Sequence, residues 1–196
     1  MPHRFTRDDA LALLHEYTQS EALRRHALAV EASMRAYARK FGGDEETWGI
    51  VGLLHDFDYE RFPSQEQHPY EGAKILRERG WPEEIVEGVL AHAPYTNTPY
   101  DTPMKKCIFA VDELSGFMYA VALMYGRSLD NVDVARVKKK LKDKNFARGV
   151  LREDIWQGLE VLGVDLDEHI ATVLEAQKSI ARDLGLETGP SAPAEG

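Results

Sequence analysis

The sequence predicts an all-α protein with a single domain. Apolar residues recur at the spacing of one helix face through most of the 196-residue chain. Ser, Thr, Asp or Pro precedes these stretches, and Gly or Pro ends them, as is typical of helix starts and stops. No segment alternates between apolar and polar residues for long enough to predict a strand, and the sequence has no internal repeat.

The first part of the chain predicts two helices separated by a glycine pair. Thr18, with Glu21 three residues later, has the pattern of a capping box at a helix start. The apolar face that follows consists of Leu23, Ala27, Val30, Met34, Tyr37 and Phe41. Two glycines at 42–43 end this helix. Asp44 begins the next one, whose apolar face leads to His55.

Proline and glycine mark the following elements. Pro69 suits the first position of a helix that Gly80 ends. Pro82 begins another helix, which extends to His92 before a further proline stops it. Residues 94–102 are rich in Pro, Thr and Asn, which predicts a loop. A loop between helices that carry ligands is well placed to line the entrance for a substrate.

The rest of the chain predicts more helices and a tail. A long helix that carries Asp112 is predicted from Thr102-Pro103 to near Gly126. Two or three further helices follow, at about 131–145, 152–162 and 167–184. Residues 188–196 are rich in Pro, Gly, Ser and Ala, which predicts a disordered tail after a domain of residues 1–187.

Charge and cysteine content exclude some classes of function. The net charge is -9, from 24 basic and 33 acidic residues, whereas a general nucleic-acid binder needs a basic surface. The single cysteine, Cys107, excludes an intrachain disulfide and a thiolate metal cluster. Its place on an apolar helix face predicts a small core residue.

The apolar stretches predict a cytoplasmic protein that does not associate with a membrane. The longest, 117–125, is shorter than the roughly 20 residues that cross a bilayer. The first residues contain no apolar run of the kind found in signal peptides. The segment 117–125 also offers an apolar surface for a homodimer.

The adjacent pair His55-Asp56 is the strongest indication of function. It follows the apolar run 50–54, and two such polar groups at the buried end of a helix are costly unless something pairs with them. Further histidines and carboxylates lie on other predicted helices or at their ends, namely His26, His68, His92 and Asp112. Imidazole and carboxylate are the ligands that hold catalytic metals while leaving positions open. The sequence therefore predicts a metal-dependent enzyme.

Helix periodicity predicts that the ligands face one interior. His26 lies between Leu23 and Val30 on an apolar face, and Asp112 lies at the edge of another. With His55 and Asp56, they supply two imidazoles and two carboxylates for a divalent ion. His68 and His92 are predicted to complete a second metal position, in which Asp56 bridges the two ions.

The order His26, His55-Asp56, Asp112 resembles the HD-domain superfamily of metal-dependent phosphohydrolases. The segment HPYEGAKIL from His68, then His92, then AVDELSG around Asp112, look like the HDIG-type branch of small stand-alone members. The resemblance covers roughly residues 20–125. It implies an HD-type helical bundle in which His26, His55, Asp56 and Asp112 are the core ligands. His68 and His92 would be the extra ligands found in the dinuclear members.

The chain departs from relatives that cleave cyclic dinucleotides. Where some of them carry Gly-Lys shortly after the His-Asp pair, this chain reads HDFDYE, and His92 stands alone where many have two histidines. That substrate is not expected. The resemblance implies instead a small phosphorylated substrate, a phosphomonoester or phosphodiester such as a nucleotide.

The predicted cofactor is one or two divalent transition metal ions, Mn, Fe, Co, Ni or Zn. Such ions would lower the pKa of a bound water toward about 7. Asp56 and Asp58 are the predicted catalytic residues. Asp58 and Glu60 lie close to the ligand pair, either as general acids or as carboxylates that orient a ligand.

A basic run at 136–148 contains seven Lys or Arg residues and one acid. Lys138, Lys139 and Lys142 are predicted to bind the substrate phosphate near the metals. In the alternative interpretation, they are the solvated face of a helix whose apolar face enters the core. His3, His15 and His169 have no partner in the pattern and are expected at the surface.

Two other functions fit the same ligands. Some proteins of the HD fold hold two irons and use oxygen to cleave C–C or C–P bonds, and His and carboxylate ligands serve iron as readily as manganese. The third hypothesis is a metal-stabilised ligand sensor with no catalytic activity.

Overall fold

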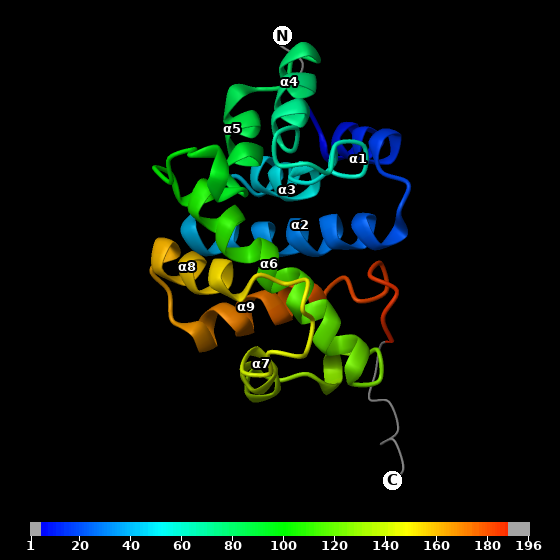
Figure 1. Ribbon diagram of the computed structural model, residues 1–196, viewed down its shortest axis with the longest axis vertical. Coiled ribbons are helices and arrows are strands. Elements are labelled where there is room, and N and C mark those ends of the chain that lie inside the picture. The colour runs from blue at the N-terminus through cyan, green and yellow to red at the C-terminus, as the bar shows by residue number, and fades with distance from the viewer. Residues whose placement is uncertain (1–4, 188–196) are drawn as a thin grey trace.

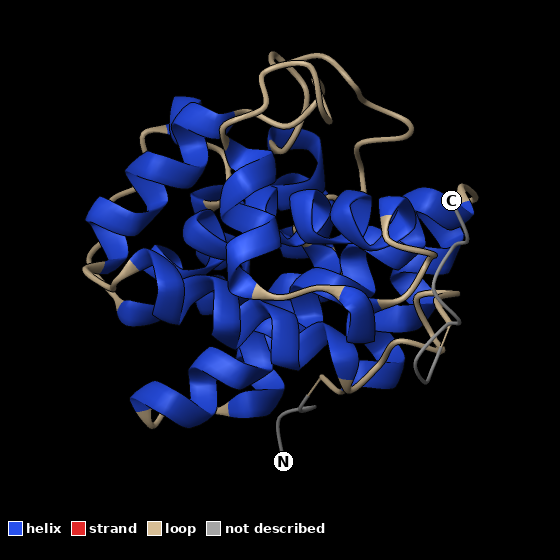
Figure 2. Ribbon diagram, turned by 90° about the horizontal axis from the view of Figure 1, so that it is seen from below, coloured by secondary structure: helices blue, strands red, loops and turns tan. Residues whose placement is uncertain are grey.

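The computed structural model describes residues 5–187, which form helices joined by loops (Figures 1 and 2). Within this range there is no strand, and the β-type pairing consists of an isolated bridge between Ser128 and Glu187. The all-α prediction is confirmed. The predicted tail, 188–196, lies outside the described residues, as does His3.

The helices have the following bounds. They are α1 (Arg7–Tyr17), α2 (Glu21–Phe41), α3 (Glu45–Leu54), α4 (Tyr70–Glu78), α5 (Glu83–Ala91), α6 (Pro103–Met124), α7 (Val134–Leu141), α8 (Arg152–Leu162) and α9 (Leu166–Lys178). Two short 3-10 turns, η1 (Pro94–Thr96) and η2 (Leu129–Asn131), lie in the connections. Figure 1 shows α3, α4 and α5 toward one end of the molecule and α7 toward the other, with α2 and α6 between them.

The first helix was not predicted, and its presence changes the structural role predicted for Thr18. The capping box lies at Thr6 and Asp9, each of whose side chains accepts from the backbone of the other. Thr18 instead follows the last turn of α1, and its hydroxyl donates to the carbonyl of Phe57 at 2.9 Å. Ser20 caps α2. The start predicted at Thr18 was wrong because a two-residue pattern does not identify which of two neighbouring helices it belongs to.

Close helix packing around α2 and α6 positions the interior side chains. α2 packs against α3, α6 and α9, and α8 packs against α6. Gly52 of α3 has no room for a side chain, since a Cβ there would lie 2.9 Å from the backbone of Glu31 on α2. A Cβ on Gly158 of α8 would lie 2.7 Å from the Cα of Ala110 on α6. Glycine thus allows two helix pairs to approach at backbone distance.

The long helix α6 is mainly a core element. Its 22 residues exceed the apolar stretch 117–125, and in the described part of the chain it is the single helix long and apolar enough to cross a membrane. Its most apolar window, however, is 61% buried inside the protein. Within 117–125, Leu123 and Met124 are exposed, and Phe117 is fully buried. Four of the nine residues in 117–125 are buried in the core of the chain itself, and the homodimer stays a prediction.

The last predicted helices are present with changed limits. The helix predicted at 152–162 is confirmed as α8, whereas α7 and α9 end several residues earlier than the ranges 131–145 and 167–184. After α9, Leu184 is still fully buried although it lies in a turn. An apolar pattern that continues through a turn does not mark the end of the helix.

His169 is buried, contrary to its predicted surface position. Its Nδ1 lies 2.6 Å from the hydroxyl of Tyr37, and its Nε2 lies 2.9 Å from the carbonyl oxygen of Ala110. Nε2 therefore donates to the carbonyl and Nδ1 accepts from the hydroxyl, which satisfies both ring nitrogens in the core. Two predictions are confirmed: His15 is exposed and Cys107 is a core residue.

Candidate metal centre

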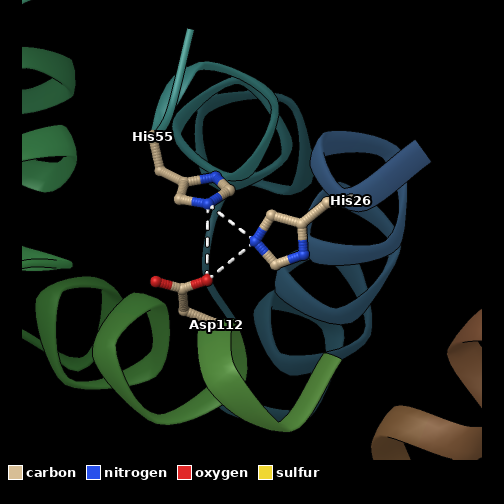
Figure 3. Close-up of side chains that lie close together, drawn as sticks. All are labelled: His26, His55 and Asp112. Atoms are coloured by element: carbon tan, nitrogen blue, oxygen red, sulfur yellow. Dashed lines mark hydrogen bonds and ion pairs between the residues drawn. The ribbon is translucent and has the colours of Figure 1, made fainter. Parts of the chain in front are cut away.

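Three helices bring His26, His55 and Asp112 to one point (Figure 3). His26 comes from α2, His55 from the end of α3, and Asp112 from the middle of α6. The Nε2 of His26 lies 2.9 Å from Oδ1 of Asp112 and 3.2 Å from Nε2 of His55. His55 Nε2 lies 3.4 Å from the same Asp112 oxygen. The predicted convergence of residues that lie up to 86 positions apart is confirmed.

A second group contains Asp56, His68 and His92. His68 precedes α4 and His92 follows α5, so the ends of two more helices contribute. Oδ1 of Asp56 lies 3.1 Å from His68 Nε2 and 3.3 Å from His92 Nε2. The two histidine Nε2 atoms are 3.1 Å apart.

Asp56 is a member of the second group and also faces the first. Its Oδ1 faces His68 and His92, as described above, and its Oδ2 lies 3.5 Å from Nε2 of His55. A carboxylate that presents one oxygen to each of two ligand groups has the geometry of a bridging ligand. The order of the six residues predicted this arrangement.

The spacing of the donor atoms fits metal ions. Two ligand atoms bound to one ion at about 2.1 Å lie about 3.0 Å apart at a right angle and about 3.4 Å apart in a tetrahedron. The distances within each group fall between 2.9 and 3.4 Å. Both groups therefore have the size of a first coordination sphere.

The tautomers of the buried histidines fit metal ions as well. Nδ1 of His55 lies 2.8 Å from the carbonyl of Gly52, and Nδ1 of His92 lies 2.6 Å from the carbonyl of Val89. A carbonyl oxygen can only accept, so each Nδ1 carries the proton and each neutral ring directs the lone pair of Nε2 at the cluster. Such lone pairs within about 3 Å of one another repel unless a proton or a cation lies between them.

In the absence of a metal, protons would take that place. Burial by itself would lower the pKa of His55, but the charges of Asp56 and Asp112 outweigh it and raise that pKa well above its ordinary value. Burial likewise opposes the rise for His68, whose hydrogen bonds with Asp56 and Asp58 raise its pKa to about 9. A metal ion must displace these protons, so metal affinity depends on pH.

Asp58 lies behind His68 rather than in the cavity. It is fully buried, and its carboxylate accepts from Nδ1 of His68 and from the backbone N–H of Gly72, both at 2.7 Å. A Cβ on Gly72 would lie 2.8 Å from this carboxylate, so glycine is required there. Of the two roles that the sequence left open for Asp58, the contacts match the orientation of a ligand.

Glu60 is placed away from the ligands. Its carboxylate accepts from the backbone N–H groups of Gln19 and Ser20, at 2.7 and 3.1 Å. These contacts hold the start of α2. Neither predicted role of Glu60 in the chemistry is supported by this position.

A cavity of about 510 Å³ opens onto both ligand groups. Pro94 and Tyr95, from the predicted loop 94–102, line it. Tyr95 also donates from its hydroxyl to the carbonyl of His68 at 3.0 Å, which ties the loop to a ligand. The expectation that this loop lines the entrance is confirmed.

Two acids of the cavity were not predicted, namely Glu113 on α6 and Asp154 on α8. Burial first, and then the neighbouring charge of Asp112, raise the pKa of both, that of Glu113 to about 7. Glu113 is adjacent to a predicted ligand, which is a signal that sequence reasoning could have used. Asp154 carried no such signal, because it reaches the cavity through the packing of α8 on α6.

The three lysines predicted to bind phosphate lie elsewhere. Lys138, Lys139 and Lys142 line a separate surface hollow with Asp167, which pairs with Lys138 at 2.6 Å. Their helix, α7, packs against α6 and α9 toward the end of the molecule opposite α3–α5 (Figure 1). Val137 of α7 enters the core, and Lys139 and Lys142 are exposed. The structure does not bring them to the metal ligands, and the geometry gives no support to their predicted contact with substrate.

Comparison with known proteins identifies a domain in the chain. A family model described as the HD domain matches residues 23–116, a range that includes all six predicted ligands. No curated protein and no solved structure matches the chain. The HDIG-type branch stays a prediction. The HD match and the converging His and Asp side chains lead to one conclusion: the chain contains an HD domain at residues 23–116.

Proposed function

We propose that this protein is a metal-dependent phosphohydrolase that cleaves a phosphomonoester or a phosphodiester with a metal-activated water. The HD domain is the domain of a superfamily of metal-dependent phosphohydrolases. The observation that carries the proposal is the position of Asp56, which faces both groups of imidazole and carboxylate donors. Two ions held a few ångströms apart suit the attack of a water on the phosphorus of an ester, from which the alcohol leaves.

Each ligand has a distinct task in this proposal. His26, His55 and Asp112 would hold one ion, and His68 and His92 the other, with Asp56 shared between them. When bound, the ions would supply a nucleophilic water at neutral pH and offset the charge of the phosphate oxygens. Asp58 touches no reacting group and acts as a positioning residue, because its hydrogen bond fixes the ring of His68.

The residues around the ligands would orient the substrate and limit access of water. Tyr59 contacts the ring of His68 edge-on, and Tyr95 is hydrogen bonded to the backbone of the same residue. Both tyrosines line the cavity together with Phe109. An apolar and aromatic wall beside a charged centre strengthens electrostatic interactions at that centre.

Substitution of Asp56 tests the proposal directly. Protein loaded with manganese or iron should release phosphate from a general phosphate ester, and Asp56→Ala should abolish turnover and lower metal content from two ions toward one. Asp8→Ala is a matched control, because Asp8 is an exposed acid in the first turn of α1. The measurements are phosphate release and metal per chain. A protein with a full metal complement that hydrolyses no phosphate ester would contradict the proposal.

A second function, a di-iron oxygenase, is favoured by the composition of the ligand set. Four histidines and a bridging carboxylate suit iron as well as manganese. Anaerobic purification with iron, followed by measurement of oxygen consumption, distinguishes the two. Oxygen uptake without release of phosphate from an ester would replace the phosphohydrolase with the oxygenase.

A further inference from the structure

Apart from the histidines of the two ligand groups, the residues among 5–187 that line the cavity beside the ligands carry acids but no lysine or arginine. Glu113 and Asp154 belong to its lining, yet neither is a member of the two ligand groups. A phosphate in this cavity would therefore be neutralised by the metal centre alone, and the rest of the substrate would face negative charge.

Neither acid has a cationic partner in the described part of the chain. No ion pair involves Glu113 or Asp154, although 29% of the whole sequence is charged. Glu113 accepts a backbone N–H from Leu151 at 3.1 Å, and this donor carries no formal charge. Its side chain is partly buried and directly follows Asp112 in the chain, and it lines the same cavity as Asp154. Neighbouring carboxylates in a partly desolvated place are costly unless a cation joins them.

The other walls of the cavity suit an organic cation. Tyr59, Tyr95 and Phe109 line it, and aromatic rings attract ammonium groups through their π faces. A polyanion such as a nucleoside triphosphate would place several negative charges beside the two carboxylates. The cavity thus combines a metal centre that would bind one phosphate with a wall that would bind a positively charged group.

We infer that the substrate is a phosphate ester that carries an amine, whose ammonium group binds between Glu113 and Asp154 while its phosphate faces the metal ligands. This inference rests on the proposed phosphohydrolase function for the phosphate half of the substrate. The contact with the amine is independent of the bond that breaks. Glu113 and Asp154 are thus the residues that determine specificity.

Three phosphate esters of nearly equal size test the effect of the positive charge on the amine. They are 2-aminoethyl phosphate, 2-hydroxyethyl phosphate and propyl phosphate, which differ only at the atom farthest from phosphorus. With manganese-loaded protein, Kd is measured by calorimetry and kcat/KM by phosphate release. A charge-assisted contact predicts that the amine is favoured over both other probes by about tenfold to hundredfold.

Variants connect this preference to the two acids. Glu113→Gln keeps an acceptor for the Leu151 N–H, and Asp154→Asn is an independent second variant on another helix. Each should reduce the preference for the amine several-fold, and together they should bring the ratio of Kd values close to one. Glu153→Gln is the control, because it removes the same charge from an exposed neighbour of Asp154 that does not line the cavity. Metal content is measured in every variant.

The outcomes separate the inference from the function on which it rests. Equal hydrolysis of all three probes supports the phosphohydrolase and overturns the amine contact. Selective binding of the amine without phosphate release supports the contact and counts against the phosphohydrolase. A preference that survives in both acid variants, or a hydroxyl probe that matches the amine, overturns the inference.

Discussion

At the scale of single residues, two aspartate side chains near the candidate metal centre differ in their surroundings because they lie a few ångströms apart. Asp56 and Asp58 are two positions apart, but the first is 22% exposed at the ligand cluster and the second is fully buried behind His68. One carboxylate faces two ligand groups, and the other accepts from a ligand's Nδ1 and a backbone N–H. The two carboxylates therefore have different surroundings, although they lie close together in the sequence.

Substitution of Asp58 should weaken one ion more than the other. In Asp58→Asn the charge that holds His68 is lost, so the affinity for the ion at His68 and His92 should fall about tenfold to hundredfold. The ion at His26, His55 and Asp112 should be nearly unaffected. Titration of the metal-free protein with manganese resolves the two affinities. Two unchanged affinities would show that Asp58 does not orient the ligand.

His169 should make stability depend on pH in the acid range. Burial lowers its pKa to about 4, from about 6.5 in the unfolded chain. Between these values the unfolded chain takes up a proton that the folded chain excludes, so stability falls as pH falls through the window. The effect is about 1.4 kcal/mol per pH unit and on the order of 3 kcal/mol across the whole window.

The variant His169→Gln isolates this contribution. Glutamine does not titrate and can still hydrogen bond to Tyr37 or to the carbonyl of Ala110. Urea unfolding at pH 7 and pH 4.5, both with chelator, should show a smaller acid loss in the variant than in the wild type. Because the metal ligands titrate in both proteins, the difference between the two belongs to position 169. Parallel losses would refute the assignment.

At the scale of elements, close approach of helices sets the shape of the site. α8 carries Asp154 to the cavity because Gly158, one turn later, lies against the backbone of Ala110 on α6. The same helix α6 carries Asp112 two residues after Ala110. The contact between α6 and α8 thus positions one wall of the cavity relative to the metal ligands.

A methyl group at this contact should force the helices apart. In Gly158→Ala the new Cβ would lie 2.7 Å from a backbone atom of Ala110, which cannot move without the helix. Overpacking of this kind costs about 1–3 kcal/mol of unfolding free energy. Gly149→Ala is the control, since nothing lies within 4 Å of a Cβ at that position. Urea unfolding compares the two, and equal stabilities would mean that α6 and α8 are less closely packed than the structure shows.

At the scale of the whole molecule, the two ligand groups connect elements that are distant in the chain. Their members come from α2, the ends of α3 and α5, the start of α4, and α6. Ions bound there would join these elements in the folded state, because the unfolded chain does not hold the ligands together. Metal binding and global stability are therefore linked.

Removal of metal should lower the thermal stability of the protein. At a free metal concentration about 100 times Kd, one ion stabilises the fold by about 2.7 kcal/mol. Chelation should therefore lower the Tm of the wild type by several degrees, and added manganese should restore it. Asp56→Ala should show a smaller chelator shift, because it removes a ligand of both groups. A Tm that does not respond to chelator in metal-loaded protein would contradict this linkage.

The sequence by itself predicted most of the helices and the set of candidate ligands. Periodicity and caps predicted α2, α3 and α6, and the place of His26, His55 and Asp112 on apolar faces or helix ends predicted that they meet. These features are visible because a helix repeats at a fixed spacing, so the direction of each side chain follows from its position along the chain. Helix α1, which packs against α3, and the surroundings of His169 carried no comparably clear pattern.

Only the tertiary structure decided what surrounds the ligands. Asp154 reaches the cavity because α8 packs closely on α6, and Lys138 does not reach it because α7 packs elsewhere. Asp58 is buried behind His68, and the N–H of Gly72 on α4 contacts its carboxylate there. Local periodicity fixes the direction of a side chain from its own helix, whereas the distance between side chains of different helices depends on how those helices pack.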